Sequence, residues 1–202
     1  MFIAVSAAHQ GLVNFRREVV DPCVARCKEW IQSSMTQAGF KILDCNIFGS
    51  HCYGLGLPTS DVDIAVVLEA GQDMEQFLEQ FRKLSNDSPE FTNTRRHQRT
   101  DCHQTEFQGL PVDVRPMKGT RASDRACRST DMLKLLIETR LNSDPSFAAK
   151  LKSILIFKLI YHHLHITQHH WQARGGSFKA ITLSYWAVAV CDTMAPDVSV
   201  SV

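Results

Sequence analysis

The sequence lacks the features that mark membrane and secreted proteins. No apolar run approaches the ~20 residues that a membrane-spanning helix needs. No basic residue precedes the apolar segment at the N-terminus, so a secretory signal is not expected. Internal repeats and low-complexity tracts are also missing. These absences predict an intracellular protein without a membrane partner, in the cytoplasm or the nucleus. Arg16 and Arg17 leave a mitochondrial presequence open, although Glu18 and Asp21 follow at once.

Paired cysteine motifs are lacking as well. The chain has seven cysteines, an odd number, and none forms a CxxC pair. This pattern favours reduced structural thiols in an intracellular protein over disulfides or a zinc site. One alternative stays open, a zinc site built from a histidine cluster: His162, His163, His165, His169 and His170.

What the chain does have is the composition of an ordinary soluble protein, 202 residues long and 44% hydrophobic. Its net charge of +1 is unevenly distributed, because residues 82–134 carry eleven Lys or Arg against seven Asp or Glu. The densest basic piece runs from Arg95 to Arg99, where a solvated loop is an equal alternative. Arg121, Arg125 and Arg128 follow in a second group. Such basic residues suit phosphate groups of RNA or of a nucleotide.

Two aspartates alternate along an apolar segment, which predicts a carboxylate site on a strand. In residues 61–67 successive side chains of a strand point to opposite faces, so Asp61 and Asp63 share one face while Val62 and Ile64 point into the core. Two carboxylates on one face of a rigid strand suit one or two Mg²⁺ ions. Upstream, Gly49-Ser50 follows another apolar run, residues 42–48, and free backbone N–H groups at such a turn could hold phosphate oxygens.

A third carboxylate, Asp113, lies in a short apolar segment that starts after Gln108-Gly109 and is expected to end at Pro116. Val112 and Val114 should face the core, which leaves Asp113 on the same face as Arg115. The alternative is that Asp113 only pairs with Arg115 or another cation.

This pattern resembles the DNA polymerase β-like nucleotidyltransferase superfamily. The residues that carry the resemblance are Gly-Ser, three residues, Gly, one residue, Gly, three residues, Ser-Asp, one residue and Asp, which here run from Gly49 to Asp63. Within the superfamily the chain looks most like the template-independent RNA-tailing enzymes, that is, non-canonical poly(A) polymerases and terminal uridylyltransferases.

The resemblance implies roles for the motif residues. Asp61, Asp63 and Asp113 would be the catalytic carboxylates and the ligands of Mg²⁺, with Mn²⁺ as an alternative, and Asp113 would be the general base on the attacking 3′-hydroxyl. Gly49, Ser50 and Ser60 would bind the nucleoside triphosphate. Arg121, Arg125 and Arg128 would contact RNA.

The order of predicted elements indicates an α+β fold. We expect helices at 21–39 and 74–84, the first capped by Asp21-Pro22, and strands at 42–48, 62–67, 91–97, 102–107 and 110–116. Further helices are expected at 131–141, 147–166 and 177–190. The expected architecture is a nucleotidyltransferase palm, a small mixed sheet flanked by helices, at residues 1–120. An incomplete all-helical module would follow at 121–202.

The helical half resembles the central domain of the tailing enzymes less closely. Lys158 lies at the position of a triphosphate-binding lysine, and Gly175-Gly176 corresponds to a turn of that domain. The next helix departs from the family pattern, because Lys179 and Ala180 replace a serine and the tyrosine that stacks on the base. Lys179 could instead bind the triphosphate. The match ends early, so we expect a fragment, a minimal form or a chain whose cleft a protein partner completes.

The resulting hypothesis is template-independent transfer of nucleotides from ATP or UTP to an RNA 3′-hydroxyl by two-metal-ion catalysis. Two alternatives remain. One is a non-catalytic relative that binds RNA or a protein partner. The other is a nucleotidyltransferase with a different acceptor, such as an oligonucleotide or cyclic-nucleotide synthase. The base added, the natural acceptor and the oligomeric state do not follow from the sequence.

Overall fold

The computed structural model describes residues 10–97, 101–120 and 123–156. The chain divides into two compact units, residues 14–131 and a second unit formed by residues 1–13 with 132–202. No helix among the described residues is long and apolar enough to cross a membrane.

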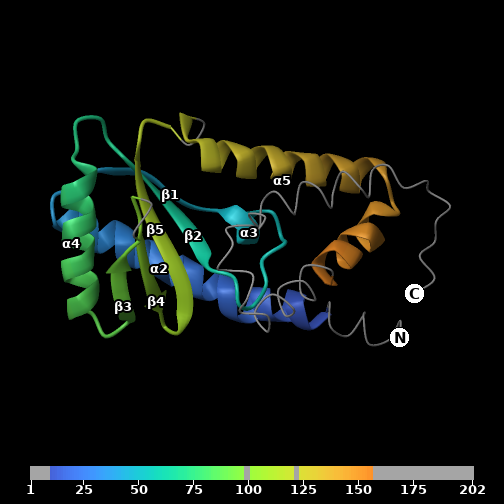
Figure 1. Cartoon of the computed structure of the whole chain (residues 1–202), viewed down its shortest axis with the longest axis horizontal. Coiled ribbons are helices and arrows are strands. Elements are labelled where there is room, and N and C mark those ends of the chain that lie inside the picture. Colours follow the sequence, from blue (N-terminus) through green and yellow to red (C-terminus); the bar gives the residue numbers. More distant parts are fainter. Residues whose placement is uncertain (1–9, 98–100, 121–122, 157–202) are drawn as a thin grey trace, which may run out of the picture. The chain divides into compact units, whose positions relative to one another are not determined.

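The first unit is built on a mixed five-stranded sheet with the strand order β1-β2-β5-β4-β3 (Figure 1). Neighbouring strands are antiparallel except for β2 and β5, which are parallel. The strands are β1 (Ile42–Phe48), β2 (Val62–Leu68), β3 (Phe91–Arg96), β4 (His103–Phe107) and β5 (Leu110–Lys118). The mixed sheet with flanking helices that the sequence predicts is therefore confirmed.

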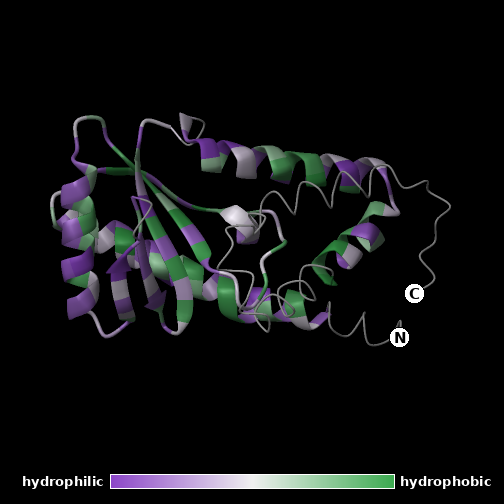
Figure 2. Ribbon diagram, in the orientation of Figure 1, coloured by the Kyte–Doolittle hydropathy of each residue, from purple (hydrophilic) through white to green (hydrophobic). Residues whose placement is uncertain are grey.

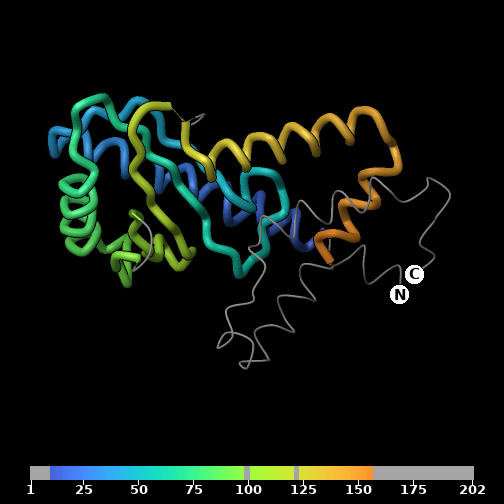
Figure 3. The backbone as a smooth tube through the Cα atoms, turned by 45° about the horizontal axis from the view of Figure 1, so that its top comes forward, coloured from blue at the N-terminus to red at the C-terminus, as the bar shows by residue number. Residues whose placement is uncertain are grey.

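The central pair of strands is distant in sequence but adjacent in space. β2 and β5 run side by side in Figures 1 and 3, with Val62 opposite Val112 and Ile64 opposite Val114. All four of these side chains are at most 1% exposed, as the alternation of apolar and polar residues predicts. The inner and edge strands differ in hydropathy. In Figure 2 the inner strand β2 is mostly hydrophobic, whereas the edge strand β3 carries mostly hydrophilic residues.

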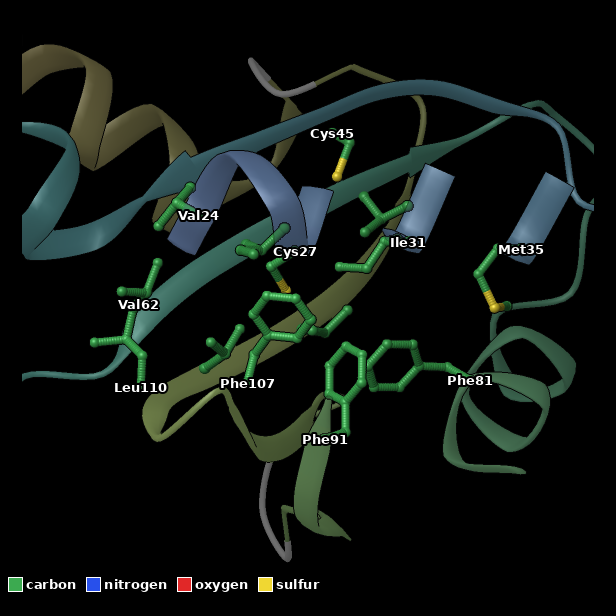
Figure 4. Close-up of a cluster of buried hydrophobic side chains, with 14 of the residues drawn as sticks. Val24, Cys27, Ile31, Met35, Cys45, Val62, Phe81, Phe91, Phe107 and Leu110 are labelled. Atoms are coloured by element: carbon green, nitrogen blue, oxygen red, sulfur yellow. The ribbon is translucent and has the colours of Figure 1, made fainter. Parts of the chain in front are cut away.

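Two helices cover the apolar face of the sheet. Helix α2 (Asp21–Gln37) directs Cys27, Ile31 and Met35 toward the strands, as Figure 4 shows. Helix α4 (Met74–Asp87) contributes Phe77 and Phe81 at helical spacing to the same core. Each of these five side chains is 0% exposed.

The cysteines are packed as small apolar groups. Six described cysteines are free thiols, five of them buried: Cys23, Cys27, Cys45, Cys102 and Cys127. Burial raises the pKa of Cys45 to about 12, so this thiol stays protonated and unreactive. The histidine cluster at residues 162–170 lies outside the described residues.

The boundaries predicted from Asp21 and Pro116 are wrong. Asp21 does not cap α2, because the chain is already helical from residue 10 and passes through a π-helical turn, η1 (Arg16–Val20), into α2. Asp21 is instead the first residue of α2, and its carboxylate lies 3.5 Å from the guanidinium of Arg16. Pro116 does not end β5, which continues to Lys118. β4 pairs with β5 only as far as Val114, so a missing N–H at Pro116 breaks no ladder bond on that edge.

The second face of the sheet is only partly apolar. Phe48, Ala65, Val67 and Met117 form a small cluster with Cys127 of α5 (Arg125–Ser143). The sequence predicted that this helix begins at Asp131, but it starts six residues earlier. Asp124 accepts hydrogen bonds from the N–H groups of Ala126 and Cys127 at 2.8 and 3.0 Å, and this N-cap fixes the earlier start.

In the second unit, α5 ends at Ser143 as the Asn142–Pro145 segment predicts. Asp144 then accepts a hydrogen bond from the N–H of Ser146 at 2.8 Å, and residues 147–156 are helical. The remainder of the expected 147–166 helix and the expected 177–190 helix lie outside the described residues.

The aromatic part of the core yields a stability prediction. The ring of Phe81 makes edge-to-face contacts with Trp30 and Phe91, at centroid distances of 6.0 and 5.8 Å. We expect Phe81→Ala to lower the free energy of unfolding by about 3–5 kcal/mol, because it leaves a cavity that the sheet cannot close. Urea denaturation measures this, with Leu43→Ala, at a 64% exposed position, as the control. A loss below ~1 kcal/mol would contradict the described packing.

Candidate active site

Two of the three predicted carboxylates stand side by side because of strand register. Asp63 of β2 pairs directly with Asp113 of β5 in the parallel ladder, and neighbouring strands of a sheet are ~4.8 Å apart. Asp61 comes one residue before β2 begins. Burial alternates along β5, so Asp113 and Arg115 share a face, as predicted.

The electrostatics of the pair follow from this arrangement. Burial, followed by the charges of Asp113 and Asp61, raises the pKa of Asp63 to about 7. Burial and the charge of Asp61 raise the pKa of Asp113 to about 6, although a hydrogen bond from Gln104 and the charge of Arg95 oppose this shift. Carboxyl groups that disfavour their ionised forms in this way are characteristic of functional sites.

The Gly49-Ser50 segment packs directly against Asp63. Gly49 has φ +69°, and a Cβ at this position would collide with the Asp63 carboxylate. Only glycine therefore allows both the left-handed turn and the close approach. The N–H of Gly49 donates a hydrogen bond to Oγ1 of Thr130 at 3.0 Å. The Gly49-Ser50 turn thus supports the side chain of Asp63 directly, and its hydrogen bond to Thr130 of α5 holds it in place.

The loop between the turn and the aspartates is closed by its own contacts. The ring of His51 lies where a Cβ on Gly56 would be, and its Nε2 is 3.2 Å from the carbonyl oxygen of Ser60. The N–H of Leu57 donates to the Ser60 hydroxyl at 3.1 Å, and the N–H of Ser60 donates back to the Leu57 carbonyl at 2.9 Å. This turn delivers the chain to Asp61 and Asp63.

Arg115, one of the cations that the sequence offered as a partner for Asp113, does not pair with it. Its guanidinium lies 3.2 Å from the carboxylate of Asp124, the residue that caps α5. The ion pair therefore links β5 to the start of α5.

A cavity of about 480 Å³ opens beside Asp113. Its lining comes from the segment before β2 and from three strands: Asp61, Asn93, Thr94, Arg95, Gln104, Thr105, Glu106, Pro111 and Asp113. Sequence reasoning singled out Arg95 only as part of a charged run. It did not find Gln104 or Thr130, because a polar strand residue and a helical threonine carry no distinguishing pattern.

Comparison with known proteins identifies the domain family. Residues 37–132, which include β1 to β5 and all three aspartates, match the model of the nucleotidyltransferase domain family. These residues belong to the DNA polymerase β-like nucleotidyltransferase superfamily. No curated protein sequence matches the chain.

The fold is also found in a solved structure. The chain resembles CdnC of E. coli MS115-1, whose structure contains ATP, with 17% identity over 83% of this chain and a TM-score of 0.56. It also matches the Cid1 poly(U) polymerase, with 18% identity over 66% of this chain and a TM-score of 0.43. GLD-2 in complex with RNP-8 is 13% identical over 67%, with a TM-score of 0.42. The chain spans 57%, 38% and 57% of these proteins, respectively.

Nucleotidyltransferases of this fold generally use divalent metals. Among residues 10–97, 101–120 and 123–156, no three His, Cys, Asp or Glu side chains are grouped as a complete ligand set. The donor chemistry nevertheless fits, because Asp63 and Asp113 place carboxylate oxygens next to each other and Asp61 contributes charge to both. Mg²⁺ and Mn²⁺ prefer oxygen ligands, and a cation there would favour the ionised carboxylates.

The remaining predicted site residues are spread more widely. Arg125 and Arg128 lie in the first part of α5, within the nucleotidyltransferase domain, and both side chains are exposed. Arg121, Lys158 and Lys179 lie outside the described residues.

The close approach of Gly49 to the Asp63 carboxylate can be tested by substituting two glycines. Gly49 and Gly71 both have positive φ, +69° and +91°, but a Cβ on Gly71 would meet nothing within 4 Å. Gly71→Ala should cost about 1 kcal/mol for backbone strain alone. Gly49→Ala should cost about 1–3 kcal/mol more, because it also displaces the Asp63 carboxylate. Thermal or urea unfolding measures both variants, and equal losses would show that Asp63 moves aside without cost.

The buried carboxylate also predicts a pH dependence of the metal-free protein. The pKa of Asp63 rises from an ordinary value near 4 to about 7 on folding, so the folded state binds the proton more tightly. Its contribution to the free energy of unfolding should therefore fall as the pH rises from about 4 through about 7. We expect Asp63→Asn to flatten this dependence and to stabilise the protein at pH 8 by up to a few kcal/mol.

Urea denaturation from pH 4 to pH 8 in the presence of a chelator measures the effect. Glu79→Gln, on the exposed side of α4, is the control. A profile of Asp63→Asn parallel to that of the unmodified protein would contradict the described burial.

Proposed function

We propose that this chain transfers nucleotides from a nucleoside triphosphate to the 3′-hydroxyl of RNA without a template. The observation that carries the proposal is the register pair of Asp63 and Asp113 beside a polar cavity, within a domain of the nucleotidyltransferase family. The choice of an RNA-tailing reaction rests on the resemblance of the chain to template-independent RNA-tailing enzymes, members of the superfamily that the motif between Gly49 and Asp63 indicates.

In the proposed reaction the oxygen of the acceptor hydroxyl attacks the α-phosphorus of the nucleoside triphosphate. A new P–O bond forms, the bond from the α-phosphorus to the oxygen bridging to the β-phosphorus breaks, and pyrophosphate leaves. Asp113 accepts the hydroxyl proton as general base. Divalent ions, when bound, stabilise the charge on the entering and leaving oxygens.

Each remaining residue has a binding role in this proposal. Asp61 and Asp63 hold the metal together with Asp113, and Gly49 seats Asp63 in the orientation that this requires. Ser50 and Ser60, on either side of the closed loop, bind the triphosphate. Lys158 and Lys179 are proposed to contact the triphosphate as well, and Arg121, Arg125 and Arg128 the RNA.

A different acceptor is the second candidate. The structure of CdnC, which has the same fold, contains ATP, so a free nucleotide is the second candidate acceptor. The amide, hydroxyl and carboxylate groups that line the cavity would accept a free nucleotide as well as an RNA end. The assay below separates the two, since a free-nucleotide acceptor needs no RNA.

The test is extension of a labelled single-stranded RNA in the presence of Mg²⁺ and each nucleoside triphosphate in turn. We expect extension by the unmodified protein, none by the Asp61→Ala, Asp63→Ala variant, and a loss of at least about 10²-fold for Asp113→Asn. Glu79→Gln, far from the proposed chemistry, should retain full activity.

Pyrophosphate release from nucleoside triphosphates alone, without extension of RNA, would indicate that the acceptor is a nucleotide and not RNA. Salt-sensitive RNA binding with neither extension nor pyrophosphate release would instead favour a non-catalytic relative. Extension that survives in the aspartate variants would refute the assigned site.

A further inference from the structure

A β-bulge in β3 places a positively charged side chain, that of Arg95, in the cavity beside Asp113. Thr92 pairs with Glu106 and Arg95 pairs with Gln104, so Asn93 and Thr94 together oppose the single residue Thr105. Asn93 has φ +58°, a left-handed conformation that asparagine tolerates better than other non-glycine residues. Hydroxyl groups hold the bulge, because Thr105 Oγ1 lies 2.8 Å from Thr94 Oγ1 and donates to the Thr92 carbonyl at 3.0 Å.

The extra residue decides which face of the sheet each arginine occupies. In a regular ladder that starts from the Thr92–Glu106 pair, Arg95 would oppose His103, whose side chain is buried on the helix-covered face. The bulge moves Arg95 opposite Gln104 and places Arg96 opposite His103. Arg95 accordingly lines the cavity, while Arg96 makes a two-pronged ion pair with Glu75 of α4, at 2.7 Å for each contact.

The consequence is a row of functional groups across three strands. Arg95 of β3 pairs with Gln104 of β4, and Gln104 pairs with Asp113 of β5. Gln104 also donates a side-chain hydrogen bond to Asp113. The Arg95 guanidinium thus lies on the same face of the sheet as Asp113, the proposed general base. Gln104, whose amide orients Asp113, lies on the strand between them.

We propose that this cavity is the acceptor subsite and that Arg95 binds the phosphate of the 3′-terminal nucleotide of the acceptor RNA. This inference rests on the proposed function and names the residue that recognises its acceptor. A general base must lie within hydrogen-bonding reach of the proton that it removes, so the hydroxyl belongs in the cavity that Asp113 borders. The volume of about 480 Å³ falls within the range of small-ligand sites, about 300–1,000 Å³.

The chemistry of the lining supports a nucleotide with its phosphate directed at Arg95. The planar guanidinium matches phosphate oxygens in a forked geometry. The other charged groups that line the cavity are Asp61, Glu106 and Asp113. These carboxylates repel a phosphate and attract hydroxyl and amino donors, so the ribose and base should lie toward them and the phosphate toward Arg95. Gln104 acts as a positioning residue for Asp113.

The experiment compares two adjacent arginines with the same charge and opposite faces. Arg95→Ala and Arg96→Ala change the net charge equally, but only the first removes a side chain from the cavity. Binding of a short fluorescent single-stranded RNA is measured by anisotropy without nucleoside triphosphate, so that no turnover is needed. We expect about tenfold weaker binding for Arg95→Ala and a change below about twofold for Arg96→Ala, with partial rescue by Arg95→Lys.

Kinetics then identify the ligand that Arg95 serves. Arg95→Ala should raise KM for the RNA about tenfold and leave KM for the nucleoside triphosphate within about twofold. A rise in KM for the nucleoside triphosphate instead would assign Arg95 to the triphosphate and overturn the inference. Equal effects of the two arginine variants would overturn it as well, since they would indicate bulk charge only.

Failure of the inference can be told from failure of the proposed function. Unmodified protein that extends RNA, together with an Arg95→Ala variant that behaves like Arg96→Ala, refutes the subsite alone. Unmodified protein that binds RNA through Arg95 but extends nothing refutes the activity and retains the subsite. An unmodified protein that binds no RNA overturns the subsite. Circular dichroism of each variant verifies folding, which is expected because Arg95 and Arg96 are both exposed.

Discussion

The parallel pairing of β2 with β5 is the constraint on which the rest of the site depends. Among the strands that the structure describes it is the only parallel pair, and it sets Asp63 beside Asp113 although they are fifty residues apart in sequence. Apolar neighbours on both strands, Val62, Ile64, Val112 and Val114, are buried against α2 and α4. A slip of either strand by one residue would turn its two apolar side chains to the opposite face of the sheet. The hydrophobic core therefore fixes the register that brings two carboxylates together against their electrostatic repulsion.

Around this pair, a few tertiary contacts hold the Gly49 turn and the start of α5 in place. Gly49 lets the turn after β1 approach Asp63, and Thr130 satisfies its N–H group. Asp124 serves twice, as the cap of α5 and as the partner of Arg115. Arg115 is thereby paired with Asp124 and not with Asp113, and the Asp63–Asp113 pair remains available to a cation, which would favour the ionised carboxylates.

The sequence was sufficient for those parts of the molecule in which local pattern and burial agree. The limits of β1 and the alternation in β2 follow from apolar periodicity, and the motif from Gly49 to Asp63 indicates the superfamily. The failures have physical reasons. Pro116 ends no strand because β4 no longer pairs with β5 at that position, and Asp21 caps no helix because the preceding turn is already helical. The cavity was missed because the β3 bulge reverses the facing of Arg95, and a bulge among polar residues leaves no periodic signal.

The most direct test of the central claim is Mn²⁺ binding followed by electron paramagnetic resonance, in which protein-bound Mn²⁺ disappears from the signal of the free ion. The account predicts that the unmodified protein binds Mn²⁺, that Mg²⁺ displaces it, and that Asp63→Asn and Asp113→Asn each abolish binding, because both carboxylates belong to one site. Unchanged Mn²⁺ binding in the two variants would contradict the account, since the register pair would then not be the metal centre.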